Sequence, residues 1–356
     1  MDSTFWSGKK VLITGHTGFK GSWLSLWLQR LGAHVIGFSL APVTQPNLYD
    51  IAQVAEGMCS VIGDIRDIGL VHQVFQQHKP DIVIHMAAQA IVRYSYLEPI
   101  ETYQTNVMGT LNILEGIRAC ETVKAAVMVT TDKCYDNKER DAPYSEDDVL
   151  GGHDPYSSSK ACAEILISSY RRSFFADKSL AAIASVRAGN VIGGGDWSTD
   201  RLIPDIIKSS KKQKRLVIRS PNAIRPWQYV LDPLCGYLLL AEQLFKQGHS
   251  YAQAWNFGPL ENDLKQVNWI ADYFSDNLAG FSWATAKEPQ LHEASILKLD
   301  CTKAHELLGW TPYFSINKTL DSIVEWHQDL DNGRNMRSVC NIQIEQFLNR
   351  AGISIS

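Results

Sequence analysis

Short apolar runs alternate with amphipathic stretches along the first half of the chain. Six runs have the length of buried strands, at residues 10–14, 34–38, 58–63, 81–86, 124–129 and 179–186. Between them the apolar positions take helical spacing, as in residues 23–31 and in the segment after Pro99. Strands that alternate with helices predict an α/β fold with a doubly wound parallel sheet and right-handed crossovers.

Glycines mark the turn between the first predicted strand and the first predicted helix. Gly15, Gly18 and Gly21 recur at every third position. Glycines let the backbone approach a pyrophosphate, and a helix N-terminus supplies amide donors. An ordinary tight turn is the alternative, but the strand–turn–helix context favours a dinucleotide site on a Rossmann-type sheet. The predicted cofactor residues of this turn are Gly15, His16, Thr17, Gly18, Phe19, Lys20 and Gly21.

Further cofactor contacts are expected beyond the carboxyl ends of the other strands, where ligands bind in such sheets. The second strand ends in Ser39 and Leu40, and neither is an acid or an arginine that would distinguish NAD from NADP. Asp64 either accepts from the adenine amino group or begins a helix, and Asn106 either contacts a ligand or holds a neighbouring strand. The predicted contacts are Asp64, Ile65, Ala87, Ala88, Gln89 and Asn106.

A polar cluster follows the fifth predicted strand. Thr131, Asp132 and Lys133 stand at its end, and Tyr156 and Lys160 lie on one face of the next predicted helix, four residues apart. An ammonium lowers the pKa of a nearby phenol, so Tyr156 is expected to take a proton from a substrate hydroxyl. Lys160 is also expected to hold the nicotinamide ribose. We expect these five residues to form the catalytic centre.

The second half of the chain is less periodic and contains a glycine-rich loop at residues 188–197. Arg219 and Arg225 stand near turns, where a guanidinium suits a diphosphate or a pyrimidine ring. The predicted substrate contacts are Gln89, Arg93, Asn190, Arg201, Leu202, Arg219 and Arg225. We expect a dinucleotide-binding domain at 1–187 with returning segments at about 230–257, and a smaller, mixed α/β substrate domain at 188–229 and 258–356.

Composition limits the kind of partner. A net charge of −4 and a pI of about 6.2 disfavour nucleic acid, and no apolar run is long enough to span a bilayer. Seven cysteines without close pairs, and no apolar export signal in residues 1–10, favour the reducing cytoplasm. His16, His85 and His153 lack metal-ligand spacing with cysteines or acids, so no metal is expected.

These motifs together resemble the extended short-chain dehydrogenase/reductases, over nearly the whole chain. The resemblance rests on the glycine turn, Asp64, Ala87-Ala88, Thr131, the Tyr156/Lys160 pair and Leu308-Gly309-Trp310-Thr311-Pro312. Within that family, four segments are similar to the nucleotide-sugar 4,6-dehydratases that act on CDP-glucose, at 18–23, 130–135, 189–197 and 225–228.

The resemblance implies an activity and an assembly. It implies a lyase with tightly bound NAD that converts CDP-D-glucose to CDP-4-dehydro-6-deoxy-D-glucose, a precursor of dideoxyhexoses in bacterial O-antigens. It also implies a homodimer or homotetramer built on the helices predicted at 99–120 and 156–173.

The resemblance further implies a role for each catalytic residue. Tyr156 takes the C4 hydroxyl proton while hydride leaves C4 for NAD, Thr131 steadies that hydroxyl, and Asp132 protonates the departing C6 hydroxyl. Lys133 departs from the relatives that act on dTDP-glucose and GDP-mannose, which carry glutamate there as the C5 base. Lys133 is therefore the C5 base, a cation that stabilises the C4 enolate, or a lysine turned to solvent.

Other functions stay open at this stage. A nucleotide-sugar 4-epimerase needs Thr131, Tyr156 and Lys160 but expels no hydroxyl, so Asp132 favours a dehydratase. A dehydratase acting on another nucleotide-hexose is also open, because no single residue reads the base. A non-catalytic dinucleotide sensor needs neither the Tyr156/Lys160 pair nor Asp132.

Overall fold

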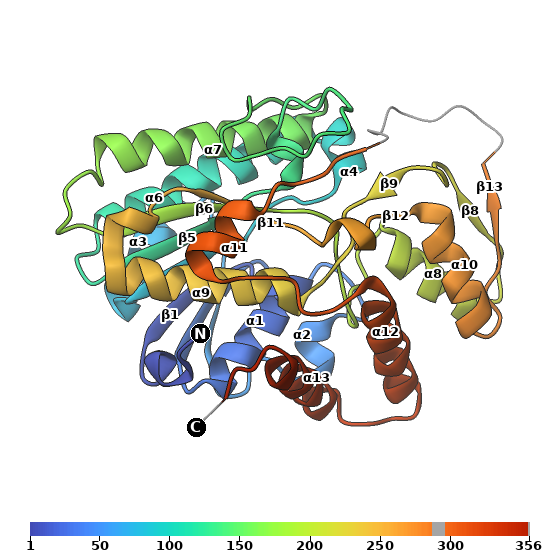
Figure 1. Cartoon of the computed structure of the whole chain (residues 1–356). Coiled ribbons are helices and arrows are strands. Elements are labelled where there is room, and N and C mark those ends of the chain that lie inside the picture. Colours follow the sequence, from blue (N-terminus) through green and yellow to red (C-terminus); the bar gives the residue numbers. More distant parts are fainter. Residues whose placement is uncertain (287–295, 355–356) are drawn as a thin grey trace.

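A seven-stranded parallel sheet forms the centre of the molecule (Figure 1). The computed structural model describes residues 1–286 and 296–354. The strands are β1 (Lys10–Thr14), β2 (His34–Ser39), β3 (Cys59–Ile62), β4 (Ile82–His85), β5 (Ala125–Val129), β6 (Ala182–Ala188) and β11 (Ala254–Phe257). Their order is β11-β6-β5-β4-β1-β2-β3, so the strand order reverses between β1 and β4. The predicted doubly wound parallel sheet is confirmed, and its ligand crevice is expected at that reversal.

Helices cover both faces of this sheet. They are α1 (Phe19–Arg30), α3 (Ile68–His78), α6 (Gly109–Arg118), α7 (Pro155–Ser173) and α9 (Leu231–Gln247). Val11 and Ile13 of β1 pack in the same cluster as Trp27 of α1 and Leu238 of α9. Leu12, between them, packs on the opposite face with α3 and α6. Because both faces are buried, the strands are apolar throughout rather than alternating.

The connection from β4 to β5 is more broken than the sequence predicts. One long helix was expected after Pro99, but the structure has α4 (Val92–Leu97), α5 (Pro99–Tyr103), a π-helical segment η2 (Gln104–Met108) and then α6. A π segment widens one helical turn and is frequent at functional sites. Here it carries Asn106, whose side chain is buried.

A second, smaller lobe lies beyond the carboxyl ends of the strands (Figure 1). Its helices are α8 (Leu202–Lys211), α10 (Val267–Asn277) and α12 (Ile316–Asp331), and they share one apolar core. Residues 225–229, expected as a rigid turn, form parts of two short strands. The short strands are β7 (Val191–Ile192), β8 (Leu216–Ile218), β9 (Ile224–Arg225), β10 (Gln228–Tyr229), β12 (Lys265–Gln266) and β13 (Trp283–Thr285).

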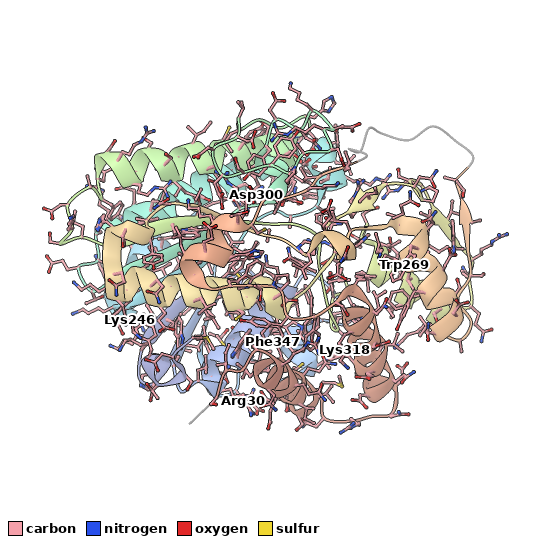
Figure 2. All side chains as sticks on the ribbon, viewed as in Figure 1. Arg30, Lys246, Trp269, Asp300, Lys318 and Phe347 are labelled. Atoms are coloured by element: carbon pink, nitrogen blue, oxygen red, sulfur yellow. The ribbon has the colours of Figure 1, made fainter. Side chains whose placement is uncertain are left out.

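The last helix, α13 (Met336–Arg350), packs against both α1 and α12 of the second lobe. The rings of Trp27 and Phe347 lie 5.5 Å apart, and Arg30 pairs with Glu345 at 2.9 Å (Arg30 and Phe347 are labelled in Figure 2). The division into two domains stays a prediction. Its boundary is affected by α13, because this helix falls in the predicted substrate domain but packs on α1 of the predicted dinucleotide-binding domain. The predicted range 258–356 also includes residues 287–295 and 355–356, which lie outside the described part.

Smaller elements complete the chain. They are η1 (Ser3–Trp6), α2 (Leu48–Ile51), η3 (Asp132–Cys134), η4 (Gly248–Tyr251), η5 (Glu261–Asp263) and α11 (Thr302–Leu308). All seven cysteines are free thiols. Within the described residues, no helix has both the length and the hydropathy of a membrane span.

Candidate active site

The glycine turn between β1 and α1 is closely packed. Gly15 has φ +80°, and a Cβ placed there would lie 2.9 Å from the backbone nitrogen of Ala87 at the end of β4. A Cβ on Gly21 would lie 2.1 Å from the carbonyl oxygen of Gly15. Gly18 is the N-cap of α1 and offers no side-chain cap. The turn therefore leaves the helix N-terminus open to an anionic ligand.

Two residues of this turn use their side chains inside the protein. His16 is buried against Gly37, and its Nε2 lies 2.8 Å from the Ser60 hydroxyl. Burial lowers the pKa of His16 to about 4. The Thr17 hydroxyl donates to the carbonyl of Leu40 at 2.8 Å. We therefore expect His16 and Thr17 to contact a ligand through their backbone atoms.

The predicted contacts after β3 are held by neighbouring side chains. Arg66 donates to the Asp64 carboxylate from both Nε (2.8 Å) and Nη2 (2.6 Å). Burial by itself would raise the pKa of Asp64. The Arg66 hydrogen bonds outweigh it and hold that pKa below its ordinary value. Ile65 is buried beneath Gly109 of α6. Asp64 thus already has a cationic partner at the sheet edge.

After β4 the chain is fastened to the π segment. The Ala87 amide donates to the Thr14 hydroxyl at 3.1 Å, with Ala88 following it. The Asn106 side chain accepts from the Gln89 amide (2.9 Å) and donates to the Gln89 carbonyl (3.0 Å) and the Ser159 hydroxyl (2.9 Å). Asn106 was expected either to contact a ligand or to hold a neighbouring strand, and these hydrogen bonds favour the second role. It joins the end of β4 to the helix that carries Tyr156.

The acid of the predicted catalytic centre is enclosed. Thr131 caps η3 and donates to Asp132 Oδ1 at 3.1 Å. Oδ2 of Asp132 is buried without a hydrogen-bond partner among the described residues, and Gly189 leaves room beside it. Burial raises the pKa of Asp132, although the charges of Lys133 and Arg225 oppose the shift. A raised pKa favours the protonated carboxyl, which is the form that a general acid needs.

Tyr156 and Lys160 are both buried near Thr131. The expectation that Tyr156 has a lowered pKa is wrong. Burial raises the pKa of Tyr156 to about 12, because a phenolate loses its hydration there, and the Thr131 hydroxyl only partly offsets this. Lys160 donates to the Val129 carbonyl at 3.2 Å, and burial lowers its pKa to about 8.

A buried ion pair that sequence reasoning missed supports this helix. Glu164 lies one turn after Lys160 on α7 and pairs with Arg187 at 2.9 Å. Thr130 and Ser185 also donate to Glu164, and Arg187 donates to the Tyr135 hydroxyl at 2.8 Å. Two features of the sequence could have revealed this pair. Glu164 stands four residues after Lys160, and Arg187 stands near the end of an apolar strand.

The predicted substrate residues have partners in several parts of the chain. Arg93 donates to Asp200 at 2.9 Å, and Arg201 lies 3.5 Å from Asp196. Arg225 acts electrostatically on Asp132, which brings it to the catalytic centre. Arg219 instead acts on Asp205 of α8. Asn190 accepts from the Gln228 amide, and Leu202 begins α8.

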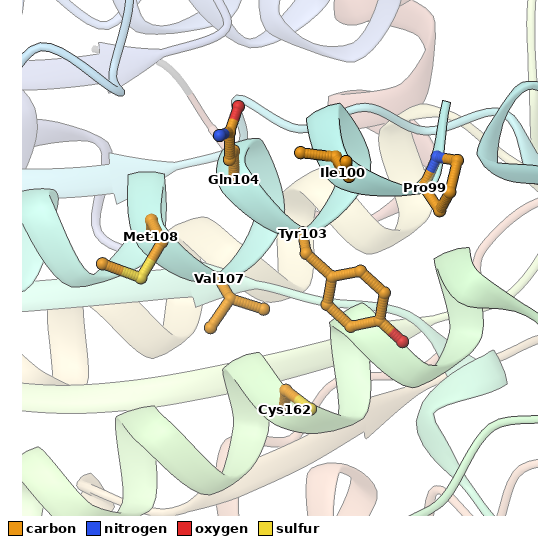
Figure 3. Close-up of a pocket in the computed structure, with 7 residues that line it drawn as sticks. All are labelled: Pro99, Ile100, Tyr103, Gln104, Val107, Met108 and Cys162. Carbon is orange, nitrogen blue, oxygen red and sulfur yellow. The ribbon is translucent and has the colours of Figure 1, made fainter. Parts of the chain in front are cut away.

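An apolar hollow of about 410 Å³ lies away from these groups, on α5, η2 and α7 (Figure 3). It is lined by Pro99, Ile100, Tyr103, Gln104, Val107, Met108 and Cys162. Its lining contains no Asp, Glu, His, Lys or Arg, and its surface is almost entirely apolar. No cluster of three or more His, Cys, Asp or Glu residues that could hold a metal occurs in 1–286 or 296–354.

Known proteins share this chain's sequence and fold. The chain is 48% identical to the CDP-glucose 4,6-dehydratase of Salmonella typhimurium, over 98% of both chains. It is 26% identical to dTDP-glucose 4,6-dehydratase 1 of Escherichia coli, over 89% of this chain and 92% of that protein. In structure it resembles the dTDP-glucose 4,6-dehydratase of Bacillus anthracis in complex with NAD, with a TM-score of 0.76, 20% identity, and coverage of 93% and 100%.

A UDP-glucose 4-epimerase of Thermotoga maritima has the same fold, with a TM-score of 0.77 and 22% identity over 90% of this chain and 99% of that one. Residues 12–323 match the family described as GDP-mannose 4,6 dehydratase. The match spans the glycine turn, the catalytic centre and most of the second lobe. The chain therefore belongs to the GDP-mannose 4,6 dehydratase family, within the extended short-chain dehydrogenase/reductases.

Proposed function

We propose that the protein is an NAD-dependent CDP-glucose 4,6-dehydratase, which converts CDP-D-glucose to CDP-4-dehydro-6-deoxy-D-glucose and water. One observation carries the reaction type: Asp132 is a buried carboxyl beside Thr131, with one oxygen unpartnered. The relative at 48% identity, named for that activity, supports the choice of substrate. We place the reaction in the cytoplasm, with the product consumed in O-antigen sugar synthesis.

The residues present fit NAD. The close-packed turn has no room for a Cβ at Gly15 or Gly21, and the N-terminus of α1 has no side-chain cap, so a pyrophosphate can meet backbone amides there. When bound, NAD would supply the hydride acceptor for C4 of the sugar and the hydride donor for C6. Lys160, held by the Val129 carbonyl at the end of β5, is placed to hold the nicotinamide ribose.

The protein's own residues move the protons. Tyr156 takes the C4 hydroxyl proton, and its raised pKa means that a positive charge must come near before the phenol ionises. The Thr131 hydroxyl lies beside Tyr156 and steadies the same oxygen. Asp132, whose pKa is raised by burial, gives its proton to the departing C6 hydroxyl.

Lys133 is the proposed C5 base. It is half-buried, and it follows Asp132 directly as the middle residue of η3. We infer from this adjacency that its amine and the Asp132 carboxyl serve the same part of the sugar. As an ammonium it would instead stabilise the C4 enolate, and a variant series separates the two roles.

A direct assay tests the function. The protein is incubated with CDP-, dTDP-, UDP- or GDP-glucose, and alkali is added to develop the near-ultraviolet absorbance of a 4-keto-6-deoxy sugar. We expect a signal with CDP-glucose at the highest kcat/KM, and no signal with any of the four would refute the dehydratase. Asp132→Asn should lower kcat by about 10²–10⁴-fold, because the acid is lost. An epimerase, which expels no hydroxyl, would keep its activity.

We also propose a homodimer built on the apolar hollow, or a tetramer made of two such dimers. Ile100 of α5 and Met108 of η2 line the hollow and are 72% and 49% exposed. Leu97 of α4 and Ile165 of α7 are also exposed, at 76% and 57%. An apolar hollow with exposed aliphatic side chains marks a protein contact. In sedimentation velocity, Ile100→Asp should shift the protein towards monomer. The control Leu260→Asp, at an exposed site in the second lobe, should not.

A further inference from the structure

His85 links two parts of the molecule that the proposed reaction must bring together. It ends β4, and its side chain is 2% exposed. Its Nδ1 lies 2.7 Å from the Thr14 hydroxyl at the end of β1, and its Nε2 lies 3.1 Å from the Thr110 hydroxyl of α6. Thr14 directly precedes Gly15, the first glycine of the dinucleotide turn. One imidazole therefore connects that turn to α6.

The neighbouring hydrogen bonds determine which ring nitrogen of His85 carries the proton. The Thr110 hydroxyl lies 2.7 Å from the backbone carbonyl of Asn106, which can only accept, so the hydroxyl donates its one hydrogen there. The Thr110 oxygen must then accept from His85, whose Nε2 is protonated. Nδ1 is left as an acceptor, and the Thr14 hydroxyl donates to it. His85 is therefore the neutral Nε2–H tautomer.

A second proton on His85 would break this arrangement. The Thr14 oxygen already accepts from the backbone amides of Met86 and Ala87, at 3.1 Å each. A protonated Nδ1 would meet the hydrogen of the Thr14 hydroxyl instead of an acceptor. Burial first, and then the positive charge of Lys160, lower the pKa of His85 to about 3. The imidazole therefore stays neutral at neutral pH.

The hydrogen bonds continue from Thr110 to the residue proposed to take the C4 hydroxyl proton. Asn106 donates through Nδ2 to the Ser159 hydroxyl at 2.9 Å, and Ser159 donates to the backbone carbonyl of Tyr156 at 2.7 Å. Each residue thus donates to the next, and hydrogen bonds aligned in this way strengthen one another. All the members of this hydrogen-bonded path are buried. They are Thr14, His85, Thr110, Asn106 and Ser159.

We propose that His85 is a positioning residue of the dehydratase reaction, which sets the place of Tyr156 relative to the dinucleotide turn. The neutral imidazole holds β1 and α6 together through its two ring nitrogens, and Asn106 and Ser159 extend this connection to the first turn of α7. Tyr156 and the cofactor must approach the same C4 group of the sugar, and a displacement of about 1 Å can slow such a step 10²-fold. The inference rests on the proposed function and adds to it a residue that acts through others.

The test uses buried threonines. Thr110→Val keeps the shape of the side chain but breaks the path, and Thr110→Ser restores the hydroxyl. Thr319→Val is the matched control, because Thr319 of α12 is also buried and its hydroxyl donates to the carbonyl four residues earlier, at 2.9 Å. We expect Thr110→Val to lower kcat for CDP-glucose by about 10-fold to 10²-fold at an unchanged KM. Thr110→Ser and Thr319→Val should keep the wild-type kcat.

An isotope effect separates positioning from stability. With CDP-glucose deuterated at C4, the isotope effect on kcat should rise in Thr110→Val, because a misplaced base slows the step at C4. Urea denaturation should show similar losses of stability in Thr110→Val and Thr319→Val. A normal kcat and isotope effect in a folded, NAD-containing Thr110→Val would overturn the proposal. So would an equal loss of kcat in Thr319→Val. If Thr110→Val does not fold, Ser159→Ala breaks the path at its far end and carries the same expectations.

The tautomer of His85 tests the path without the reaction. In protein labelled with nitrogen-15 in its histidines, the ring nitrogen shifts distinguish the two neutral tautomers, and His85→Asn assigns the signal. We expect the neutral Nε2–H form across about pH 5 to 8. An Nδ1–H tautomer or an imidazolium would overturn the proposal whether or not the protein is a dehydratase. Wild-type inactivity on all four nucleotide sugars would instead refute the dehydratase itself.

Discussion

The carboxylate of Glu164 lies 2.9 Å from the guanidinium of Arg187, and both side chains are almost fully buried beneath the catalytic centre. The pair joins α7, which carries Tyr156 and Lys160, to β6. Thr130 and Ser185 satisfy the remaining acceptor positions of the carboxylate. This pair therefore fixes the helix of the proposed base to the sheet.

Glu164→Gln should destabilise the protein strongly, because it leaves the Arg187 charge buried without its partner. We expect a loss of about 3–5 kcal/mol in the free energy of unfolding, measured by urea denaturation. The control is Glu345→Gln, which removes the exposed pair with Arg30 at the same distance of 2.9 Å. That change should cost under about 1 kcal/mol. Equal losses would contradict the role of the buried pair.

Lys133→Ala should stop solvent deuterium from entering C5 of the substrate, if the amine is the C5 base. Mass spectrometry of sugar recovered from D₂O measures the rate. Lys133→Arg separates the alternatives: a guanidinium restores exchange if a cation suffices, and fails if a base is needed. Lys138→Ala, at an exposed position paired with Asp136, is the control. Normal exchange in Lys133→Ala would show that the base is elsewhere.

Gly21→Ala should weaken both the fold and NAD retention, since its Cβ would lie 2.1 Å from the backbone oxygen of Gly15. Relieving such a contact costs about 1–3 kcal/mol. Thermal unfolding and the NAD content of the purified protein measure the two effects. Gly18→Ala is the matched control for stability, because its nearest atom is 3.3 Å away. A Gly21→Ala protein as stable as Gly18→Ala would be inconsistent with this packing.

Asp232 should make stability depend on pH. It lies in the first turn of α9, where burial raises its pKa to about 8. In the unfolded chain Asp232 has the ordinary aspartate pKa of 3.8, so the folded state binds more protons between these two values. The free energy of unfolding therefore receives a contribution from Asp232 that falls as pH rises from about 4 to about 8.

Asp232→Asn should remove that contribution, because the amide keeps an oxygen to accept from the Tyr313 amide but never ionises. Urea denaturation at several pH values should show a variant that gains stability over the wild type as pH rises. Asp141→Asn, at an 89% exposed side chain, should follow the wild type. Parallel curves for Asp232→Asn and the wild type would rule out the buried, protonated Asp232.

Several parts of the site could be read from short stretches of chain. The apolar run at residues 10–14 matches β1, and the spacing of Tyr156 and Lys160 puts both on α7. The glycine interval predicted the tight turn that Gly15 and Gly21 form. These features depend on residues a few positions apart, whose geometry is set by the period of a strand, a turn or a helix.

Other parts needed the folded molecule. Lys20 meets Tyr237 across 217 positions of sequence, and α13 returns to α1 at the end of the chain. The pKa of Tyr156 was predicted in the wrong direction, because a four-residue spacing says nothing of burial. The sequence alone thus determined the elements and the chemical groups that they carry. Which groups meet, and how much water each retains, only tertiary packing decided, because contact and desolvation arise between segments that are distant along the chain.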